Sequence, residues 1–167
     1  MPVYDVELSV AGINDVIRHL NDFRQSLERA EHEIVSMLAN DAAADMQASL
    51  SAVTDPDGNI DAQIDPPQVT GNEAVVSMSG SQAAYLEFGT GVVGARNPHE
   101  LSAQVGWQYG AGSHYRTFRN GRVGWVYFDR SRNHYRVTSG VAPQRIVLRA
   151  GQTTRMRVLA RVREALR

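Results

Sequence analysis

The chain has 167 residues, which suits a single domain with its own hydrophobic core. Hydrophobic residues make up 43% of it and charged residues 21%, as in an ordinary folded protein, and without cysteine it can form neither disulfides nor thiolate metal sites. No apolar run approaches the roughly 18 residues of a membrane span, and the first ten residues alternate in hydropathy, unlike a signal peptide. We therefore expect neither membrane insertion nor secretion.

The net charge of −1 hides a segregation of charge along the chain. Residues 1–95 contain 15 Asp and Glu against 3 Arg, a net charge of −12. Residues 96–167 contain 14 Arg against 3 Asp and Glu, a net charge of +11, and the chain has no lysine. This asymmetry predicts either complementary charged faces on like subunits or an anionic partner. The alternative is a genomic preference for arginine codons combined with chance segregation.

The first predicted element is a short strand over residues 3–10, where apolar and polar side chains alternate. Gly12 ends this strand. Asn14 is the predicted N-cap of the helix that follows, because its side chain can accept a hydrogen bond from a backbone N–H of the first turn.

The strongest periodic pattern comes next. Apolar residues recur at alternating steps of three and four, which predicts a long amphipathic helix with a heptad seam. The seam consists of Ile13, Val16, Leu20, Phe23, Leu27, Ala30, Ile34 and Met37. A helix from Ile13 to Leu50 would span roughly 55 Å, more than the roughly 40 Å diameter of a compact domain of this size. We expect either a bend near residues 42–44 or a helix end that packs on a neighbouring subunit.

Two short strands are predicted after the helix, because residues 60–64 and 74–78 alternate in hydropathy. Asp55–Gly58 predicts the turn that ends the helix, Pro66–Pro67 end the first strand, and Gly71–Asn72 predict the turn before the second strand. These strands predict a small, mainly antiparallel sheet.

An arginine-rich and aromatic hairpin is predicted further along the chain. Residues 113–119 and 122–128 flank Asn120–Gly121, the preferred pair for a two-residue type I′ turn. Residues 135–138 predict one more strand. The glycine-rich residues 88–113, before the hairpin, predict a loop.

A terminal helix is predicted over residues 144–167, after Pro143, with arginines around an apolar stripe. The stripe consists of Met156, Leu159, Val162 and Leu166. The predicted fold is therefore α+β: a long N-terminal helix and a C-terminal helix pack on a small, mainly antiparallel sheet. Residues 1–167 form one domain, in which residues 92–139 are a loop and hairpin insertion.

One stretch is recognisable by its particular residues instead of by a repeating hydropathy pattern: Ala84-Tyr85-Leu86-Glu87-Phe88-Gly89-Thr90-Gly91. It resembles the signature of a family of tail-component proteins from long-tailed bacteriophages, known as neck or tail-completion proteins. Other sequence segments occur in the same order along the chain as in that family. The long helix begins after Ala11-Gly12-Ile13, and Gly140-Val141-Ala142-Pro143 precedes the terminal helix.

The resemblance implies a structural virion protein, assembled in the host cytoplasm, that forms a ring of six or twelve subunits around the DNA channel. Such a ring joins the head connector to the tail and contacts other neck and tail proteins. The signature itself is expected to shape a rigid turn at an interface, with Gly89 allowing a positive φ and Glu87 accepting backbone N–H bonds or pairing with an arginine. The residues of this structural motif are Tyr85, Leu86, Glu87, Phe88, Gly89 and Thr90.

Sequence patterns for enzyme chemistry are weak. Residues 89–94 satisfy G-x-G-x-x-G, but Asn97–Pro98 follow where a dinucleotide site requires a helix. Asp55, Asp57, Asn59 and Asp61 alternate like a calcium loop, but Gly58 stands at the fourth position instead of the sixth, and Pro66 stands at the twelfth, where the loop requires glutamate. None of the five histidines has helical zinc spacing, so we expect them on the surface or against aromatic rings. We expect no catalytic residue, no metal and no cofactor.

The alternative function is nucleic-acid binding. Residues 109–136 interleave arginines with aromatic side chains, as single-strand binding surfaces do, and a basic hairpin can also follow duplex phosphates. Arg116 is expected to face Trp125 across the hairpin. The candidate residues for contact with DNA or a partner protein are Arg116, Arg119, Arg122, Arg130 and Arg132. The same hairpin could instead be a solvated surface hairpin, or bind the acidic half of a neighbouring subunit.

Overall fold

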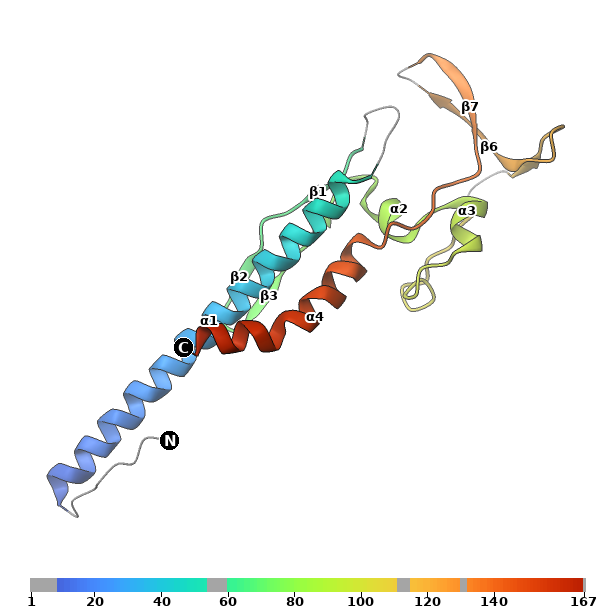
Figure 1. Cartoon of the computed structure of the whole chain (residues 1–167). Coiled ribbons are helices and arrows are strands. Elements are labelled where there is room, and N and C mark those ends of the chain that lie inside the picture. Colours follow the sequence, from blue (N-terminus) through green and yellow to red (C-terminus); the bar gives the residue numbers. More distant parts are fainter. Residues whose placement is uncertain (1–8, 54–59, 111–114, 130–131, 167) are drawn as a thin grey trace.

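The computed structural model describes residues 9–53, 60–110, 115–129 and 132–166. The molecule is elongated. Helix α1 (Val10–Ser51) extends to one end, and a three-stranded sheet projects at the other (Figure 1). The strand predicted at residues 3–10 lies mostly outside the described residues, and Val10 belongs to α1.

Helix α1 begins earlier than the sequence predicts. Ser9 is its N-cap, with an extended backbone and a hydroxyl that accepts a hydrogen bond from the Gly12 N–H at 3.1 Å. This bond satisfies one of the N–H groups that a helix start leaves without a partner. Asn14 therefore lies inside the helix, and the prediction that it is the N-cap is wrong.

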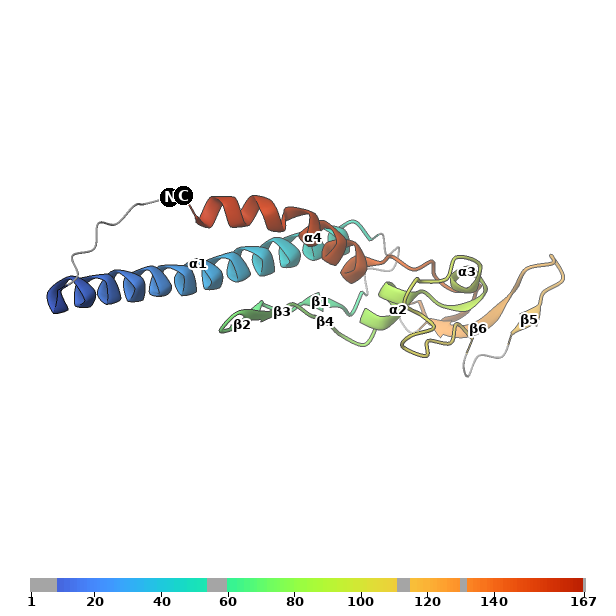
Figure 2. The ribbon, with the colours of Figure 1, turned by 90° about the horizontal axis from the view of Figure 1, so that it is seen from below.

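The whole of α1 forms one unbroken helix of 42 residues (Figure 2), about 63 Å long. The bend expected near residues 42–44 does not occur. Its buried residues begin only at Ala30, whereas Leu20 and Phe23 in the first half are each 62% exposed. The first half of α1 therefore extends beyond the other described elements, and its packing on a neighbouring subunit stays a prediction.

Helix α4 (Ile146–Ala165) packs along the second half of α1 and confirms the predicted terminal helix (Figure 2). Two ion pairs join the helices. Arg157 lies 2.9 Å from Asp45, and Arg161 lies 2.7 Å from Asp41. The segregation of charge along the chain therefore brings acidic α1 against basic α4 within one molecule.

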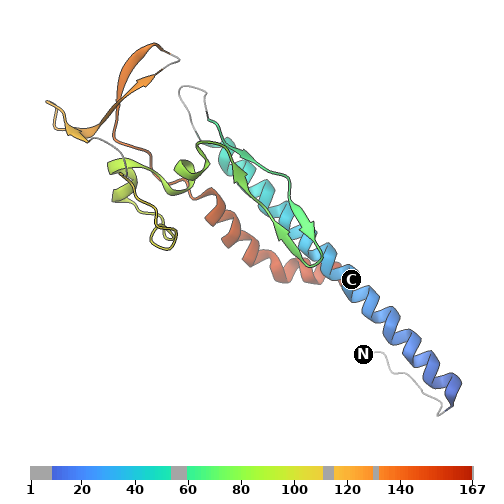
Figure 3. The same cartoon turned by 180° about the vertical axis from the view of Figure 1, so that it is seen from behind.

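Two small antiparallel sheets cover α1 on the side opposite α4 (Figure 3). Strand β1 (Gln63–Ile64) pairs with β4 (Met78–Ser79), and β2 (Gln68–Thr70) pairs with β3 (Glu73–Val75). A turn at Gly71, with φ of +62°, joins β2 to β3 as predicted.

The strands predicted at residues 60–64 and 74–78 form only in part. The second one is interrupted after Val75, because β3 pairs with β2 whereas β4 pairs with β1. Pro66–Pro67 end β1 as expected, but the chain then forms β2, which was not predicted from the sequence. Three residues are too few for a hydropathy alternation to identify a strand.

The hydrophobic core lies where α1, α4 and the short strands meet. Its buried members are Met46, Leu50, Leu86, Ile146 and Ala150. Partly buried side chains of the β1–β4 region surround them, among them Ile60, Ile64 and Met78. The core is small because it is confined to one part of an elongated molecule.

The third sheet contains the arginine-rich hairpin. Strands β5 (Arg116–Thr117), β6 (Val123–Asp129) and β7 (His134–Thr138) are antiparallel, in that order. The hairpin and the additional strand are thus confirmed. Arg116 lies opposite Gly124 rather than Trp125, so the predicted contact between Arg116 and Trp125 is wrong.

The turn of this hairpin has three residues instead of two. The Phe118 N–H donates to the Arg122 carbonyl, and the Gly121 N–H donates to the Phe118 carbonyl, both at 2.8 Å. Gly121 has a φ of +75°, whereas Asn120 does not have a positive φ. A type I′ turn requires positive φ at both central residues, so the turn is instead a three-residue loop that ends in a left-handed glycine.

The predicted α+β class is confirmed, with a long N-terminal helix, a C-terminal helix and antiparallel strands. The strands are divided among three small sheets instead of forming one. Within the described residues, neither long helix has the length and apolar character needed to cross a membrane.

The ion pair between Asp41 and Arg161 should stabilise the contact between α1 and α4. We expect Asp41→Asn to lower the free energy of unfolding by about 1–2 kcal/mol, because two charge-assisted hydrogen bonds are lost. Urea unfolding at neutral pH measures this. Asp22→Asn, on the uncovered half of α1, is the control. Equal midpoints for the two variants would show that the pair contributes nothing.

The same ion pair should make stability depend on pH. Hydrogen bonding from Arg161 lowers the pKa of Asp41 below its ordinary value. The folded state therefore favours the ionised carboxylate, so this stabilisation is present above the ordinary pKa of Asp and is lost as the pH falls through the lowered pKa. On acidification, the wild type should lose more stability than Asp41→Asn does. Parallel pH profiles of the two proteins would contradict the assignment.

Candidate functional site

The signature octapeptide folds into two short helices joined by a tight connection. Helix α2 (Ala83–Phe88) ends at Gly89, which has a φ of +75°, and helix α3 (Gly91–Arg96) begins after Thr90. The expected rigid turn is thus limited to Gly89 and Thr90. The loop predicted for residues 88–113 is wrong in its first part, where α3 forms.

Glu87 is the central side chain of this region and is only 6% exposed. The Val147 N–H donates to its Oε2 at 2.8 Å, and the Leu148 N–H donates to its Oε1 at 3.0 Å. These N–H groups belong to the first turn of α4, which otherwise leaves them without partners. A carboxylate there is also favoured by the positive end of the helix dipole. The expectation that Glu87 accepts backbone N–H bonds is confirmed; its third partner is a histidine, not an arginine.

That third partner is His99, whose ring lies fully inside the protein. Its Nε2 lies 3.0 Å from Glu87 Oε1, and its Nδ1 accepts a hydrogen bond from the Leu101 N–H at 3.1 Å. Because Nδ1 is an acceptor, the hydrogen-bond network assigns the ring hydrogen to Nε2, which donates to Glu87. The His99 ring also packs on Phe88, with 4.5 Å between centroids, as expected for an aromatic-packed histidine. Both ring nitrogens are engaged within the protein.

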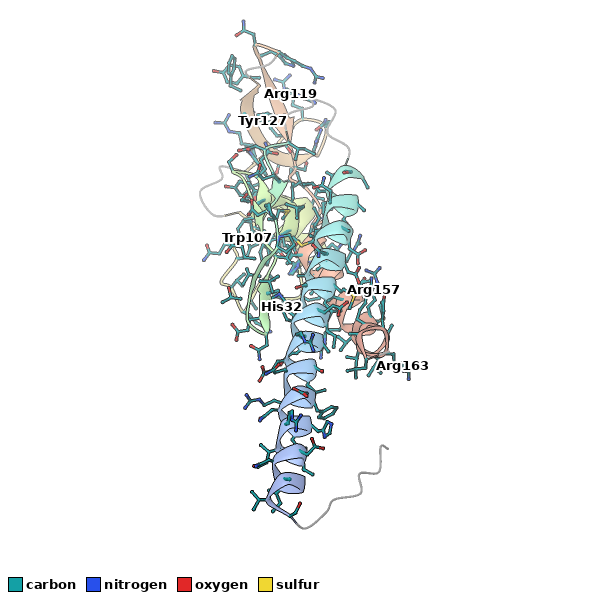
Figure 4. The ribbon with its side chains drawn as sticks, turned by 90° about the vertical axis from the view of Figure 1, so that its left-hand side faces the viewer. His32, Trp107, Arg119, Tyr127, Arg157 and Arg163 are labelled. Carbon is teal, nitrogen blue, oxygen red and sulfur yellow. The ribbon has the colours of Figure 1, made fainter. Side chains whose placement is uncertain are left out.

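Aromatic side chains pack against one side of the Gly89–Thr90 connection between α2 and α3. Phe88 stacks on Trp107 with ring centroids 5.2 Å apart, and Tyr85 meets the same indole edge-on at 5.8 Å. The Trp107 Nε1–H donates to the Gly89 carbonyl at 3.0 Å. Figure 4 places Trp107 near the middle of the elongated molecule. Of the three large residues expected to hold the motif, Leu86 and Phe88 pack inward, whereas Tyr85 is half exposed.

The segment Gly140–Pro143 packs against the other side of the Gly89–Thr90 connection. Thr90 and Val141 exchange backbone hydrogen bonds of 2.8 and 3.1 Å. A Cβ on Gly89 would lie 2.7 Å from Pro143 and from the Val141 carbonyl, and one on Gly140 would overlap the Thr90 carbonyl. These glycines are therefore required by a close approach of two backbones. The two landmarks of the resemblance, fifty residues apart in sequence, are in direct contact.

Arg145 joins the same junction with an unusual backbone. It precedes α4 in a left-handed conformation, with a φ of +56°. Its Nε lies 3.0 Å from the Glu100 carboxylate, and its Nη2 donates to the Asn97 side chain and the Pro98 carbonyl. The backbone N–H of Glu100 itself and then Arg145 hold the pKa of the Glu100 carboxyl below its ordinary value. This left-handed residue costs roughly 1–2 kcal/mol, which the hydrogen bonds offset.

Four residues of this junction were not predicted from the sequence: His99, Glu100, Trp107 and Arg145. Each has its partner 12 or more residues away in sequence, and none belongs to a recognisable motif. The predicted calcium-like stretch lies mainly outside the described residues, and its last member, Asp61, accepts hydrogen bonds from Ser81. In the described part of the chain, no three His, Asp or Glu side chains are grouped as metal ligands.

The candidate arginines lie apart from this junction, on the projecting sheet. Arg119 lies in the turn between β5 and β6, and Figure 4 shows it on the projecting sheet. Arg122 donates through Nε to the Ser139 hydroxyl at 3.0 Å, whereas the side chains of Arg116 and Arg119 are exposed and form no ion pair within the described residues. Arg132 is exposed next to β7, and Arg130 lies outside the described residues.

Comparison of the chain with models of known protein families, with curated proteins and with solved structures finds no match.

Glu87→Gln should destabilise the protein strongly for an isosteric change. The amide has only one acceptor oxygen, and its NH₂ group would face the N–H groups of α4, so we expect a loss of about 2–3 kcal/mol in the free energy of unfolding. Denaturant unfolding measures it. The control is Glu73→Gln on exposed β3. A cost no larger than that of the control would show that the carboxylate does not hold α4.

Gly89→Ala should separate steric overlap from backbone strain. Gly89 and Gly106 both have positive φ, but a Cβ on Gly106 would meet nothing within 4 Å. We expect Gly106→Ala to cost about 1 kcal/mol and Gly89→Ala about 3 kcal/mol or more, because Pro143 must move. Thermal unfolding compares them. Similar costs would mean that the two backbones are not in close contact.

Proposed function

We propose that this chain is a structural subunit of a tailed bacteriophage, which assembles into a ring in the neck, joins the head connector to the tail and surrounds the DNA channel. The observation that carries the proposal is an uncovered apolar seam on the first half of α1. Its side chains are between 44% and 62% exposed. They are Ile13, Leu20, Phe23 and Leu27 of the heptad seam, together with the neighbouring Ile17. A continuous apolar surface of this kind is typical of a subunit that is covered by another chain.

Two further apolar surfaces lie elsewhere on the molecule. On the projecting sheet, the cross-strand pairs Val126–Val137 and Phe128–Tyr135 share one face, and Tyr135 is 73% exposed. On α4, the outward stripe around Leu159 is similarly exposed. These three surfaces are spread along an elongated molecule, which suits a subunit with copies on both sides and different proteins above and below.

The signature region supports a mechanical role. The polar groups of Glu87 and His99 are used to hold α2, α4 and the following loop together. The resemblance of residues 84–91 to the phage family, and their contact with the late glycine-proline segment, are the reasons for placing the ring in the neck. Arg116 and Arg119 on the projecting sheet are suited to line a channel that carries DNA, because their side chains are exposed and form no ion pair with another described residue.

Electron microscopy of the purified protein, and of particles that contain it, tests this proposal. We expect a closed ring of six or twelve copies at the junction of head and tail. A monomer or dimer that is absent from purified particles would overturn the neck assignment.

Nucleic-acid binding remains a second candidate because the projecting sheet exposes arginines beside aromatic rings. Under this alternative, short single-stranded DNA should bind with an affinity that falls steeply with salt. The double variant Arg116→Ser, Arg119→Ser should reduce the slope of log affinity against log salt by roughly 1.5. The control is Arg18→Ser, on α1, where Arg18 pairs with Asp15. Fluorescence anisotropy measures the slope, and binding that both variants leave unchanged would exclude this sheet as the DNA contact.

A further inference from the structure

Strand β7 lies at the edge of the projecting sheet. The strand order is β5–β6–β7, so among the described residues β7 has a neighbouring strand on one side only. Outside its pairing with β6, none of the backbone groups of residues 134–138 bonds to another described backbone group. In such an edge strand, alternate residues direct their N–H and C=O groups away from the sheet. A further strand can therefore pair with the outer edge of β7.

One face of this sheet is apolar and uncovered. Tyr135 and Val137 of β7 lie opposite Phe128 and Val126 of β6, and all four side chains are exposed. Tyr135 is 73% exposed and meets Phe128 edge-on, with 5.2 Å between ring centroids. Strand β5 adds only two residues to the pair of β6 and β7. A sheet this narrow gains stability from one more strand that covers part of its apolar face.

The remaining side chains of β7 give the opposite face a basic character. His134 and Arg136 alternate with the apolar residues and therefore lie on the other side of the sheet. Residues 115–138 contain six Arg against one Asp, a net charge of +5. A strand that complements the edge of β7 should thus alternate apolar with acidic side chains.

Residues 4–8, which precede the described part of the chain, have this alternation. The apolar or aromatic side chains are Tyr4, Val6 and Leu8, and the acidic ones between them are Asp5 and Glu7. The segment contains no basic residue, so its net charge is −2. It is five residues long, as is β7, and its alternation is the reason that the sequence predicts a strand there.

The two patterns agree on one register. When Asp5 lies opposite Arg136, the apolar side chains of residues 4–8 fall on the face of Tyr135 and Val137. This holds for parallel and for antiparallel pairing, because the side chains of paired strands alternate together. A slip by one residue would place the acidic side chains on the apolar face. Charge and hydropathy therefore favour the same pairing.

The chain cannot make this contact with itself. The N-terminal end of α1 and the projecting sheet lie at opposite ends of the elongated molecule (Figures 1 and 3). Helix α1 alone is about 63 Å long, whereas the chain from Ser9 back to Tyr4 reaches at most about 20 Å. The strand that pairs with β7 must then come from another copy.

We infer that residues 4–8 of one copy add as a strand to the outer edge of β7 in the next copy. Main-chain hydrogen bonds provide the affinity of such a strand addition, and the alternating side chains provide its specificity. The contact is head-to-tail, because the segment and the edge lie at opposite ends of the molecule. It generates a closed ring when the rotation between copies closes. The inference rests on the proposed function in that like copies assemble, and it adds the segments through which they join.

Cysteine cross-linking of the full chain tests the contact, because the chain has no cysteine of its own. The variants are Val6→Cys and Tyr135→Cys, and Tyr135 does not belong to the hydrophobic core. With a short bismaleimide, the double variant should form a ladder of dimers, trimers and larger species. A mixture of the two single variants should form only dimers with one copy of each. The matched control is a mixture of Val6→Cys with Val75→Cys, on β3 and 62% exposed, which should not cross-link.

The other outcomes separate this contact from the proposed function. Dimers of Tyr135→Cys with itself, and none with Val6→Cys, would mean that β7 pairs with β7 and would overturn the inference. A ring at the junction of head and tail, formed by a protein that gives no ladder, would retain the proposed function and overturn this contact. A ladder from a protein that is absent from purified particles would retain the contact and overturn the neck assignment.

Two aspartate substitutions within the segment test its facial alternation. Val6→Asp puts a charge on the apolar face, so it should weaken self-association by about tenfold or more. Val3→Asp adds the same charge on the side of Asp5 and Glu7, so it should change self-association by no more than about twofold. Sedimentation velocity over a range of concentrations compares the variants, with circular dichroism to verify folding. Equal weakening by both substitutions would contradict strand pairing.

Discussion

The buried Glu87 carboxylate is the interaction on which the arrangement of the chain depends. It accepts two N–H groups from the start of α4 and one hydrogen bond from His99. A buried carboxylate is tolerated only when its oxygens have such partners. The same carboxylate therefore sets the end of α2, the start of α4 and the path of the loop after α3. Because α4 then runs back along α1, this one group orients the whole C-terminal helix.

Backbone contacts complete the junction around that carboxylate. Thr90 and Val141 exchange hydrogen bonds, and the Gln144 N–H donates to the Leu86 carbonyl at 2.7 Å. Glycines at positions 89 and 140 let the two segments approach more closely than a Cβ would allow. The result is a stiff connection between the helical part of the molecule and the projecting sheet. Stiffness of this kind suits a subunit that must hold several partners at set positions.

The small core and the large exposed apolar surfaces have a common explanation in the proposed assembly. Among the described residues of a single chain, only a few large side chains are buried where α1, α4 and the short strands meet. The chain leaves the seam of α1, the outer stripe of α4 and one face of the β6–β7 sheet in water. If these surfaces are covered by neighbouring copies and partner proteins, a large part of the apolar burial belongs to the assembly instead of the monomer. The opposite charges of α1 and α4 serve the contact between these two helices within one chain.

Periodicity alone determined the two long helices, because an apolar seam repeated over many turns is a strong local signal. Turn residues likewise located the Asn120–Gly121 hairpin and the Gly71 turn, although the register and loop length of the hairpin depended on cross-strand bonds that no local pattern specifies. The motif around Glu87 was visible in the sequence, but its partners were not. His99, Trp107 and Arg145 became neighbours only through the path of the backbone, because hydrogen bonds across 12 to 60 residues leave no periodic trace in the sequence. Tertiary structure also decided which apolar residues are buried: the heptad seam of α1 is continuous in sequence, yet only its second half meets α4 and the strands.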